Sequence, residues 1–150
     1  MATTLLLPQD FKEFLRLLNE KAVEYLLVGG YAVGYYGYPR PTGDMDIWIA
    51  ANNENAIKVI AALEDFGFAS SVSVFQSLAQ ENNIIRLGFP PFRLEIITSI
   101  DGVSFSECYA QRTVAALDHI QVNVISLHHL KINKKASGRL KDLSDLENLP

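Results

Sequence analysis

The chain has 150 residues, enough for one full hydrophobic core, and its single cysteine, Cys108, excludes an intrachain disulfide and cysteine-based metal sites. It is 49% hydrophobic and 20% charged, with a formal net charge of −4, which argues against disorder and against nonspecific binding to long nucleic acid. We find no signal peptide and no apolar run long enough to span a membrane, and therefore expect one cytoplasmic domain over residues 1–150.

Hydrophobic periodicity and turn residues predict the secondary structure in chain order. A helix over 8–21 opens the chain, and a strand, a short helix, a second strand and a second long helix follow it. The predicted helices are 8–21, 31–37, one from a cap at residue 52 or 53 to 66, 103–112, 127–136 and 140–149. The predicted strands are 23–28, 44–50, 83–89, 92–99, 113–117 and 120–125. Residues 70–75 are read either as a strand or as an extended loop. This order predicts a single α/β or α+β domain in which helices flank a mixed sheet.

The stretch from residue 26 to residue 49 holds the main functional signal. An apolar run ends at Gly29 and Gly30, where the absence of a side chain lets the backbone approach a ligand closely. If the following residues are helical, the amide groups of this turn lie at a helix N-terminus, where phosphate binds readily. The pair therefore predicts a phosphate-binding turn.

Two carboxylates follow at the start of the second strand. Asp44 and Asp46 lie two residues apart, so in a strand they share one face, roughly 7 Å apart. Carboxylates beside a phosphate cradle suggest Mg²⁺ held between protein and a nucleoside triphosphate. The alternative interpretation is that both residues cap or solvate a loop that enters the strand.

A glycine pair followed by a Thr-Xaa-Asp-Xaa-Asp-Ile element resembles the nucleotidyltransferases of the DNA polymerase beta superfamily, and in particular their small stand-alone members. The resemblance implies a nucleotidyltransferase fold, with Gly29 and Gly30 binding the nucleotide and Asp44 and Asp46 binding metal. It also implies a third carboxylate on a later strand. The best match is Glu95, although the family usually has aspartate there. The alternative for Glu95 is a salt bridge with Arg93 or Arg86.

Three further residues are candidates for nucleotide contacts. The hydroxyl of Thr42 either binds a phosphate oxygen or fixes the turn. The segment at residues 134–146, Lys-Lys-Ala-Ser-Gly-Arg-Leu-Lys-Asp-Leu-Ser-Asp-Leu, is similar to the C-terminal segment of the small nucleotidyltransferases. By that resemblance Lys134 and Lys141 contact the triphosphate, and the alternative is a basic helix on the surface.

The resemblance implies an enzyme that transfers a nucleoside monophosphate from an NTP to an acceptor hydroxyl, with Mg²⁺ as cofactor. The acceptor is a small molecule, a protein side chain or an RNA end. Small members often belong to toxin–antitoxin pairs, so a partner protein is one candidate acceptor. Compared with the larger enzymes of the family, we expect no appended helical acceptor domain, so that acceptor binding would need a second subunit of the same chain; a mean hydropathy of +0.11 is compatible with such a buried interface. Two alternatives stay open: an inactive binding or regulatory module of the same fold, and an unrelated α/β domain.

Overall fold

The computed structural model describes residues 7–39, 42–89 and 92–150. Six strands form one mixed sheet in the order β3-β4-β2-β1-β6-β5. β1 runs antiparallel to β2 and parallel to β6, and β2 runs parallel to β4. The strands are β1 (Tyr25–Val28), β2 (Asp44–Ile49), β3 (Ile84–Phe89), β4 (Phe92–Ile97), β5 (Thr113–Leu117) and β6 (Ile120–Val124).

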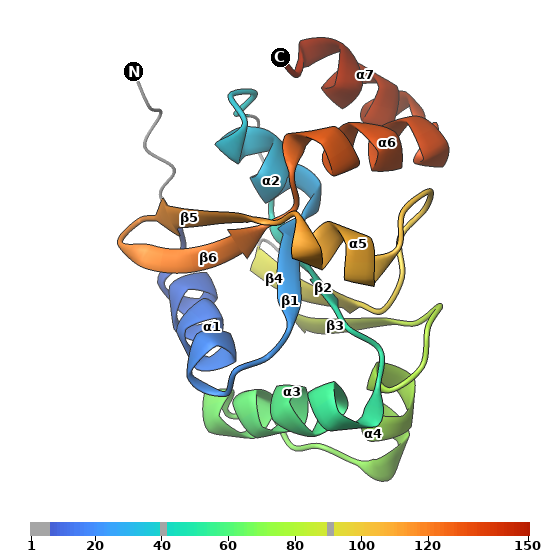
Figure 1. The fold of residues 1–150 in the computed structure, drawn as a ribbon. Helices are drawn as coiled ribbons and strands as arrows, with labels where there is room; N and C mark the ends of the chain where they lie inside the picture. The colour runs from blue at the N-terminus through green and yellow to red at the C-terminus, as the bar shows by residue number, and fades with distance from the viewer. Residues whose placement is uncertain (1–6, 40–41, 90–91) are drawn as a thin grey trace.

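Helices lie around the sheet and at both ends of the molecule. In Figure 1, α6 and α7 pack together at one end of the molecule, and α3 and α4 lie at the opposite end. The helices are α1 (Gln9–Glu20), α2 (Gly29–Tyr35), α3 (Asn53–Phe66), α4 (Val72–Leu78), α5 (Phe105–Ala110), α6 (Leu127–Ser137) and α7 (Leu140–Asn148). None of the helices in the described part of the chain has the length and apolar character that a membrane crossing requires.

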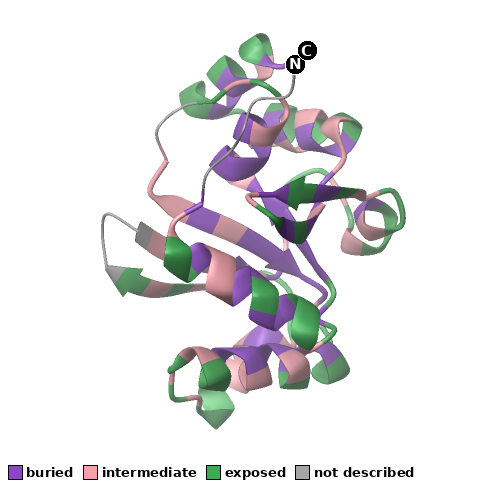
Figure 2. Cartoon of the chain, turned by 90° about the vertical axis from the view of Figure 1, so that its left-hand side faces the viewer, coloured by how far each residue is buried: buried purple, intermediate pink, exposed green. Residues whose placement is uncertain are grey.

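The core is densest around the central strands, which are buried along most of their length (Figure 2). All four residues of β1 are buried, as expected of a strand with neighbours on both sides and helices over its faces. α1 contributes an apolar stripe, and its Phe14 packs edge-on against Phe66 of α3, with ring centroids 5.4 Å apart. Gly29 and Gly30 directly follow β1, and Asp44 and Asp46 lie in β2, so the predicted site borders this packed centre of the sheet.

The structure confirms the predicted fold class and most of the predicted elements. Side-chain caps begin three of the helices: Asn52 accepts from the Asn55 amide at 2.8 Å, and Ser71 and Ser126 make equivalent contacts. Gly67 and Gly138 end α3 and α6 in the left-handed conformation, with φ of 106° and 65°. The sequence therefore marks helix ends well, because the capping residues act locally.

Residues 70–75 differ from both interpretations of the sequence. They belong mostly to α4, which begins after the Ser71 cap and runs to Leu78. The Ser-Val-Ser-Val alternation resembles a strand, but Leu78 is the only fully buried residue of this helix. The alternating residues therefore do not pack against a sheet, and the local signal of the Ser71 cap favours the helix.

Strand register brings the predicted site residues together. Val28, the last residue of β1, pairs with Asp46 of β2. On the other side of β2, Asp46 pairs with Glu95 of β4, and Asp44 pairs with Arg93. Because β2 and β4 are parallel, the carboxylates of Asp46 and Glu95 lie on one face of the sheet, next to the turn that follows β1.

Candidate active site

The turn after β1 places glycine against a carboxylate. Gly29 has a φ of +68°, and a Cβ atom there would lie 2.0 Å from Asp46 Oδ2. Both the backbone conformation and the space therefore require glycine. At Gly30 a Cβ would meet Thr42 Oγ1 at 2.9 Å, so this position is crowded without a left-handed backbone. α2 begins at Gly29, two residues earlier than the sequence predicts.

The three predicted carboxylates lie on neighbouring strands, and arginines engage two of them. Asp44 accepts two hydrogen bonds from Arg93, at 3.2 Å from Nε and 3.1 Å from Nη2. Glu95 accepts one from Arg86 Nε at 3.0 Å. The salt bridge expected as the alternative role of Glu95 therefore exists, although Arg86 is 58% exposed and such pairs contribute little in water.

Of the three carboxylates, Asp46 has the least favourable surroundings for its ionised form. Its Oδ1 is buried and has no hydrogen-bond partner among the described residues. Burial, followed by a hydrogen bond and repulsion from Glu95, raises the pKa of Asp46 to about 7, and the Lys141 ammonium opposes part of that shift. Holding the ionised form here is costly, and a bound cation would offset the cost.

The donor set fits a hard divalent cation, because every candidate ligand is a carboxylate oxygen. Within the part of the chain that the structure describes, however, no three His, Cys, Asp or Glu side chains are already arranged to hold a metal ion. Arginines instead pair with two of the carboxylates, Arg93 with Asp44 and Arg86 with Glu95. A metal would therefore compete with the two arginines for these oxygens.

A cleft opens between the carboxylates and the α6–α7 corner. It has two adjoining parts of about 510 and 380 Å³ that share several lining residues. Thr42 and the three carboxylates line the cleft on one side, and its shared wall carries Gly30, Arg139 and Lys141. The cleft is thus lined by both acidic and basic groups, as expected of a site that binds a metal-bound phosphate chain.

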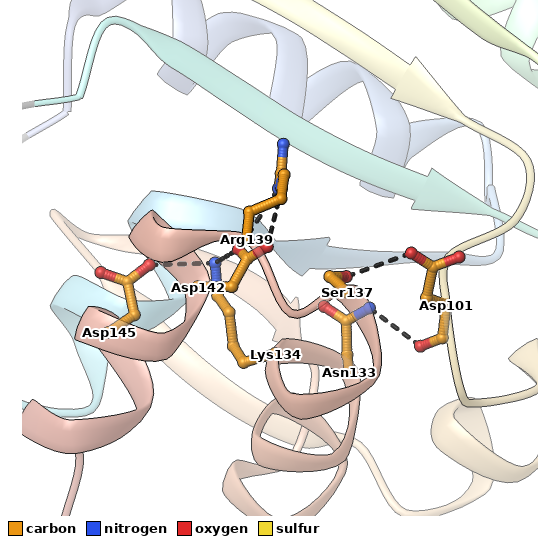
Figure 3. Close-up of polar contacts among 7 residues, drawn as sticks. All are labelled: Asp101, Asn133, Lys134, Ser137, Arg139, Asp142 and Asp145. Atoms are coloured by element: carbon orange, nitrogen blue, oxygen red, sulfur yellow. Dashed lines mark hydrogen bonds and ion pairs between the residues drawn. The ribbon is translucent and has the colours of Figure 1, made fainter.

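The three other predicted nucleotide contacts have different surroundings. The Thr42 hydroxyl donates to the Asp44 carbonyl at 3.2 Å, so it fixes the turn and also borders the cleft. Lys141 is exposed on the cleft wall. Lys134 is only 3% exposed, and its ammonium is paired with Asp142 and Asp145 (Figure 3). Its contact with a triphosphate stays a prediction.

Known structures share this architecture over nearly the whole chain. A Thermotoga maritima protein provisionally assigned as a nucleotidyltransferase superposes with a TM-score of 0.61 at 16% identity, covering 91% of this chain and 88% of its own. The lincosamide antibiotic adenylyltransferase LnuA, solved with lincomycin bound, also gives 0.61, at 18% identity and with 97% of each chain covered. The chain has the nucleotidyltransferase fold. No protein-family model and no curated protein sequence matches it.

At these identities the similarity establishes the fold, and the reaction has to follow from the site residues of this chain. Within the nucleotidyltransferase fold seen here, sequence reasoning missed Arg139. This residue immediately precedes α7 and lies on the cleft wall next to Lys141. The sequence feature that could have found Arg139 is its place directly after Gly138, which ends α6. A side chain just past a helix end can point away from the surface of that helix.

Glu95 gives a prediction whose sign depends on pH. In the metal-free protein, Glu95→Gln removes repulsion from Asp46 and also weakens the pair with Arg86. At pH 8, where Asp46 is ionised, we expect the variant to be more stable than wild type by about 1 kcal/mol. At pH 5 Asp46 is protonated in the folded state, and the lost pair should leave the variant less stable by up to about 1 kcal/mol.

Urea denaturation in EDTA at pH 5 and pH 8 measures the difference in stability between the variant and wild type, and so tests its sign at each pH. Arg86→Gln is the matched control, because it breaks the same pair and leaves the neighbouring carboxylates in place. It should be mildly destabilising at both pH values. A Glu95→Gln variant that is destabilised equally at pH 5 and pH 8 would show that Glu95 acts only as a partner of Arg86.

Proposed function

We propose that this protein transfers a nucleoside monophosphate from an NTP to an acceptor hydroxyl, with Mg²⁺ as cofactor. The observation that carries the proposal is Asp46. This half-buried carboxylate has one buried, unpartnered oxygen and a pKa of about 7, and it lies against Gly29 and beside Glu95. A protein gains nothing in stability from such a group, so a cation that binds there explains why the cleft contains it.

Asp46, Asp44 and Glu95 would hold the metal. When bound, Mg²⁺ neutralises charge on the phosphate that is attacked and on the pyrophosphate that leaves. Arg93 and Arg86 occupy Asp44 and Glu95 without ligand, and they would release these carboxylates as the metal takes their place. The arginines also reduce the repulsion within the cluster when it is empty, although Glu95 still repels Asp46.

The other residues of the cleft bind and orient. The turn at Gly29 and Gly30 has no side chains and lets a phosphate chain approach the backbone. Arg139 and Lys141, on the facing wall, supply positive charge for its oxygens. In the reaction the acceptor oxygen bonds to the α-phosphorus, the bond to pyrophosphate breaks and the hydroxyl proton is released. The protein contributes position and charge rather than covalent chemistry.

A small hydroxylated molecule is the acceptor class that the comparisons favour. LnuA, which matches this chain over 97% of both lengths, is an adenylyltransferase that acts on a lincosamide antibiotic. Protein side chains and RNA ends are the other acceptors that fit the chemistry. The net charge of −4 gives no general attraction to RNA, which places RNA ends last.

The second candidate function is a binding module that keeps the fold without turnover. The arginine pairs favour it, because Asp44 and Glu95 are already neutralised without a metal. The two functions differ in one measurable respect. An enzyme must release Asp44 and Glu95 to the metal and turn over the NTP, whereas a module can bind nucleotide and release no pyrophosphate.

Labelled nucleotides test the proposal. The protein is incubated with each of the four NTPs labelled at the α-phosphate, with Mg²⁺ or EDTA, in the presence of host lysate or a panel of hydroxylated small molecules. We expect Mg²⁺-dependent transfer of label to one class of acceptor, with release of pyrophosphate. Calorimetry provides the binding measurement. Mg²⁺-dependent NTP binding without transfer would support the binding module, and no binding at all would overturn both functions.

A further inference from the structure

A buried ionic cluster of Lys134, Asp142 and Asp145 joins α6 to α7, and Lys134 and Asp142 also border the smaller part of the cleft. Lys134 Nζ lies 3.1 Å from Asp142 Oδ1 and 3.0 Å from Asp145 Oδ2. The three side chains are 4%, 1% and 2% exposed. Burying charged groups is costly even when they are paired, so this arrangement calls for a reason beyond joining two helices.

The charge of the cluster explains where Arg139 lies. Lys134 carries one formal positive charge and the two aspartates carry two formal negative charges, so Lys134 alone does not balance the pair. Arg139 supplies the missing cation through two bonds to Asp142, from Nε to Oδ2 at 2.7 Å and from Nη2 to Oδ1 at 3.2 Å. Burial opposes ionisation of Asp142, but the bonds from Arg139 and Lys134 outweigh it, and the pKa of Asp142 lies below its ordinary value.

Arg139 has one side on the cluster and one side on the cleft. Its side chain is 69% exposed and lines both parts of the cleft. Figure 3 shows its guanidinium extending from Asp142 toward the neighbouring strand, with Asp145 reaching Lys134 from the other side. A long exposed side chain normally samples many rotamers. Two bonds to a buried carboxylate fix this one in advance, which lowers the entropy cost of binding an anion.

We propose that Asp142 is a positioning residue, which presents Arg139 to the phosphates of the nucleotide, and that Lys134 acts through Asp142 instead of touching the triphosphate. This inference rests on the proposed function and reassigns the role that the sequence suggested for Lys134. Asp142 and Lys134 have no need to contact the ligand, because the charge they order is carried by Arg139.

A second set of contacts holds α6 independently of Asp142. Asn133 Nδ2 donates to the Asp101 carbonyl at 3.0 Å, and Ser137 Oγ donates to Asp101 Oδ2 at 3.3 Å (Figure 3). Gly102 packs so closely that a Cβ there would lie 2.6 Å from Ala136. The loop after β4 therefore fixes α6 from the opposite side, and we expect Asp142→Asn to fold.

The test is a cycle of variants: Asp142→Asn, Arg139→Gln and the double variant, with Asp145→Asn as the matched control. Asp145 is as buried as Asp142 and pairs with the same lysine. The probes are inorganic triphosphate and whichever NTP wild type binds most tightly, titrated by calorimetry with Mg²⁺ into protein shown to be folded by circular dichroism. The NMR signal of the Arg139 Nε–H group reports whether that side chain is held.

We expect Asp142→Asn and Arg139→Gln each to weaken binding of both probes about 10-fold, as loss of one charged hydrogen-bond contact does. The double variant should be no weaker than Arg139→Gln alone, and Asp142→Asn should lose the ordered Arg139 signal. Asp145→Asn should lower stability and bind both probes like wild type.

Three results would overturn the inference. The first is an equal loss of binding in Asp145→Asn, which would make the cluster merely structural. The second is additive losses in the double variant, which would show that Asp142 does not act through Arg139. The third is loss of NTP binding in Asp142→Asn while triphosphate binding is retained. A wild type that binds neither probe is a different failure, because it overturns the proposed function on which this inference rests.

Discussion

Asp46→Asn is expected to weaken Mg²⁺-dependent nucleotide binding by at least about 100-fold. The substitution removes the negative charge of a carboxylate whose Oδ1 is buried and unpartnered, and which a metal would neutralise. Asp44→Asn with Asp46→Asn should behave in the same way. Calorimetric titration of Mg²⁺ with the best-bound NTP measures the loss. A folded Asp46→Asn variant that binds with wild-type affinity would remove Asp46 from the site.

The same substitution should make the metal-free protein more stable at high pH. The folded pKa of Asp46 is raised from 3.8 to about 7, so the folded state holds a proton that the unfolded state has lost. Wild-type stability should therefore fall as the pH rises from about 4 to about 7, by at most about 4 kcal/mol, and stay level above that. Asp46→Asn lacks this slope and should gain its full advantage at pH 8.

Urea denaturation in EDTA between pH 4 and pH 8 measures this dependence. Asp44→Asn is the matched control, because Asp44 has its own arginine partner at a third-exposed position. That variant should keep the wild-type slope and lose up to about 1 kcal/mol at every pH. Parallel curves for wild type and Asp46→Asn would contradict the raised pKa.

Gly29→Ala should have the largest effect on stability of any single methyl addition in the site. Its φ of +68° is a left-handed conformation, and the new Cβ would overlap the Asp46 carboxylate at 2.0 Å. Backbone strain and overpacking together predict a loss of roughly 2–5 kcal/mol. Nucleotide binding by the folded fraction should also be lost, because Asp46 must move. Thermal and urea unfolding measure the first effect, and calorimetry measures the second.

Two comparisons separate the strain from the overlap. In an Asp46→Ala background the overlapping carboxylate is gone and only the Cβ of residue 46 stays close, at 3.1 Å, so Gly29→Ala should cost mainly the backbone strain, about 1–2 kcal/mol. Gly30→Ala meets the Thr42 side chain at 2.9 Å and has no left-handed φ, so it should cost less than Gly29→Ala. Equal costs at the two glycines would show that the close approach to Asp46 contributes nothing.

The sequence predicts the acidic side of the site well, because its signals are local. Gly29 and Gly30 end an apolar strand, and Asp44 and Asp46 begin another, so each pair can be placed on its element without knowledge of the fold. The pairing of Asp46 with Glu95 needs the parallel register of β2 and β4. That register depends on long-range packing, and only the resemblance to a family suggested it.

The basic side was harder to predict for a physical reason. In the sequence, Lys134 resembles the other cations of a polar helix, and no neighbouring residue indicates that its side chain is buried. Its partners, Asp142 and Asp145, lie beyond the helix break at Gly138 and reach it only because α7 folds back onto α6. The angle between two helices is a tertiary property, so the sequence could not show that Lys134 is buried in ion pairs while Arg139 is exposed to the cleft.

The site is assembled from segments far apart in the order of synthesis. Asp44 and Asp46 come from β2 and Glu95 comes from β4, whereas Arg139 and Lys141 lie close to the C-terminal end. During synthesis, a growing chain therefore carries the carboxylates and their partners Arg86 and Arg93 long before Arg139 and Lys141 exist. If the proposed function holds, a chain that ends before Arg139 should lack the Mg²⁺-dependent NTP binding that we propose for the full chain.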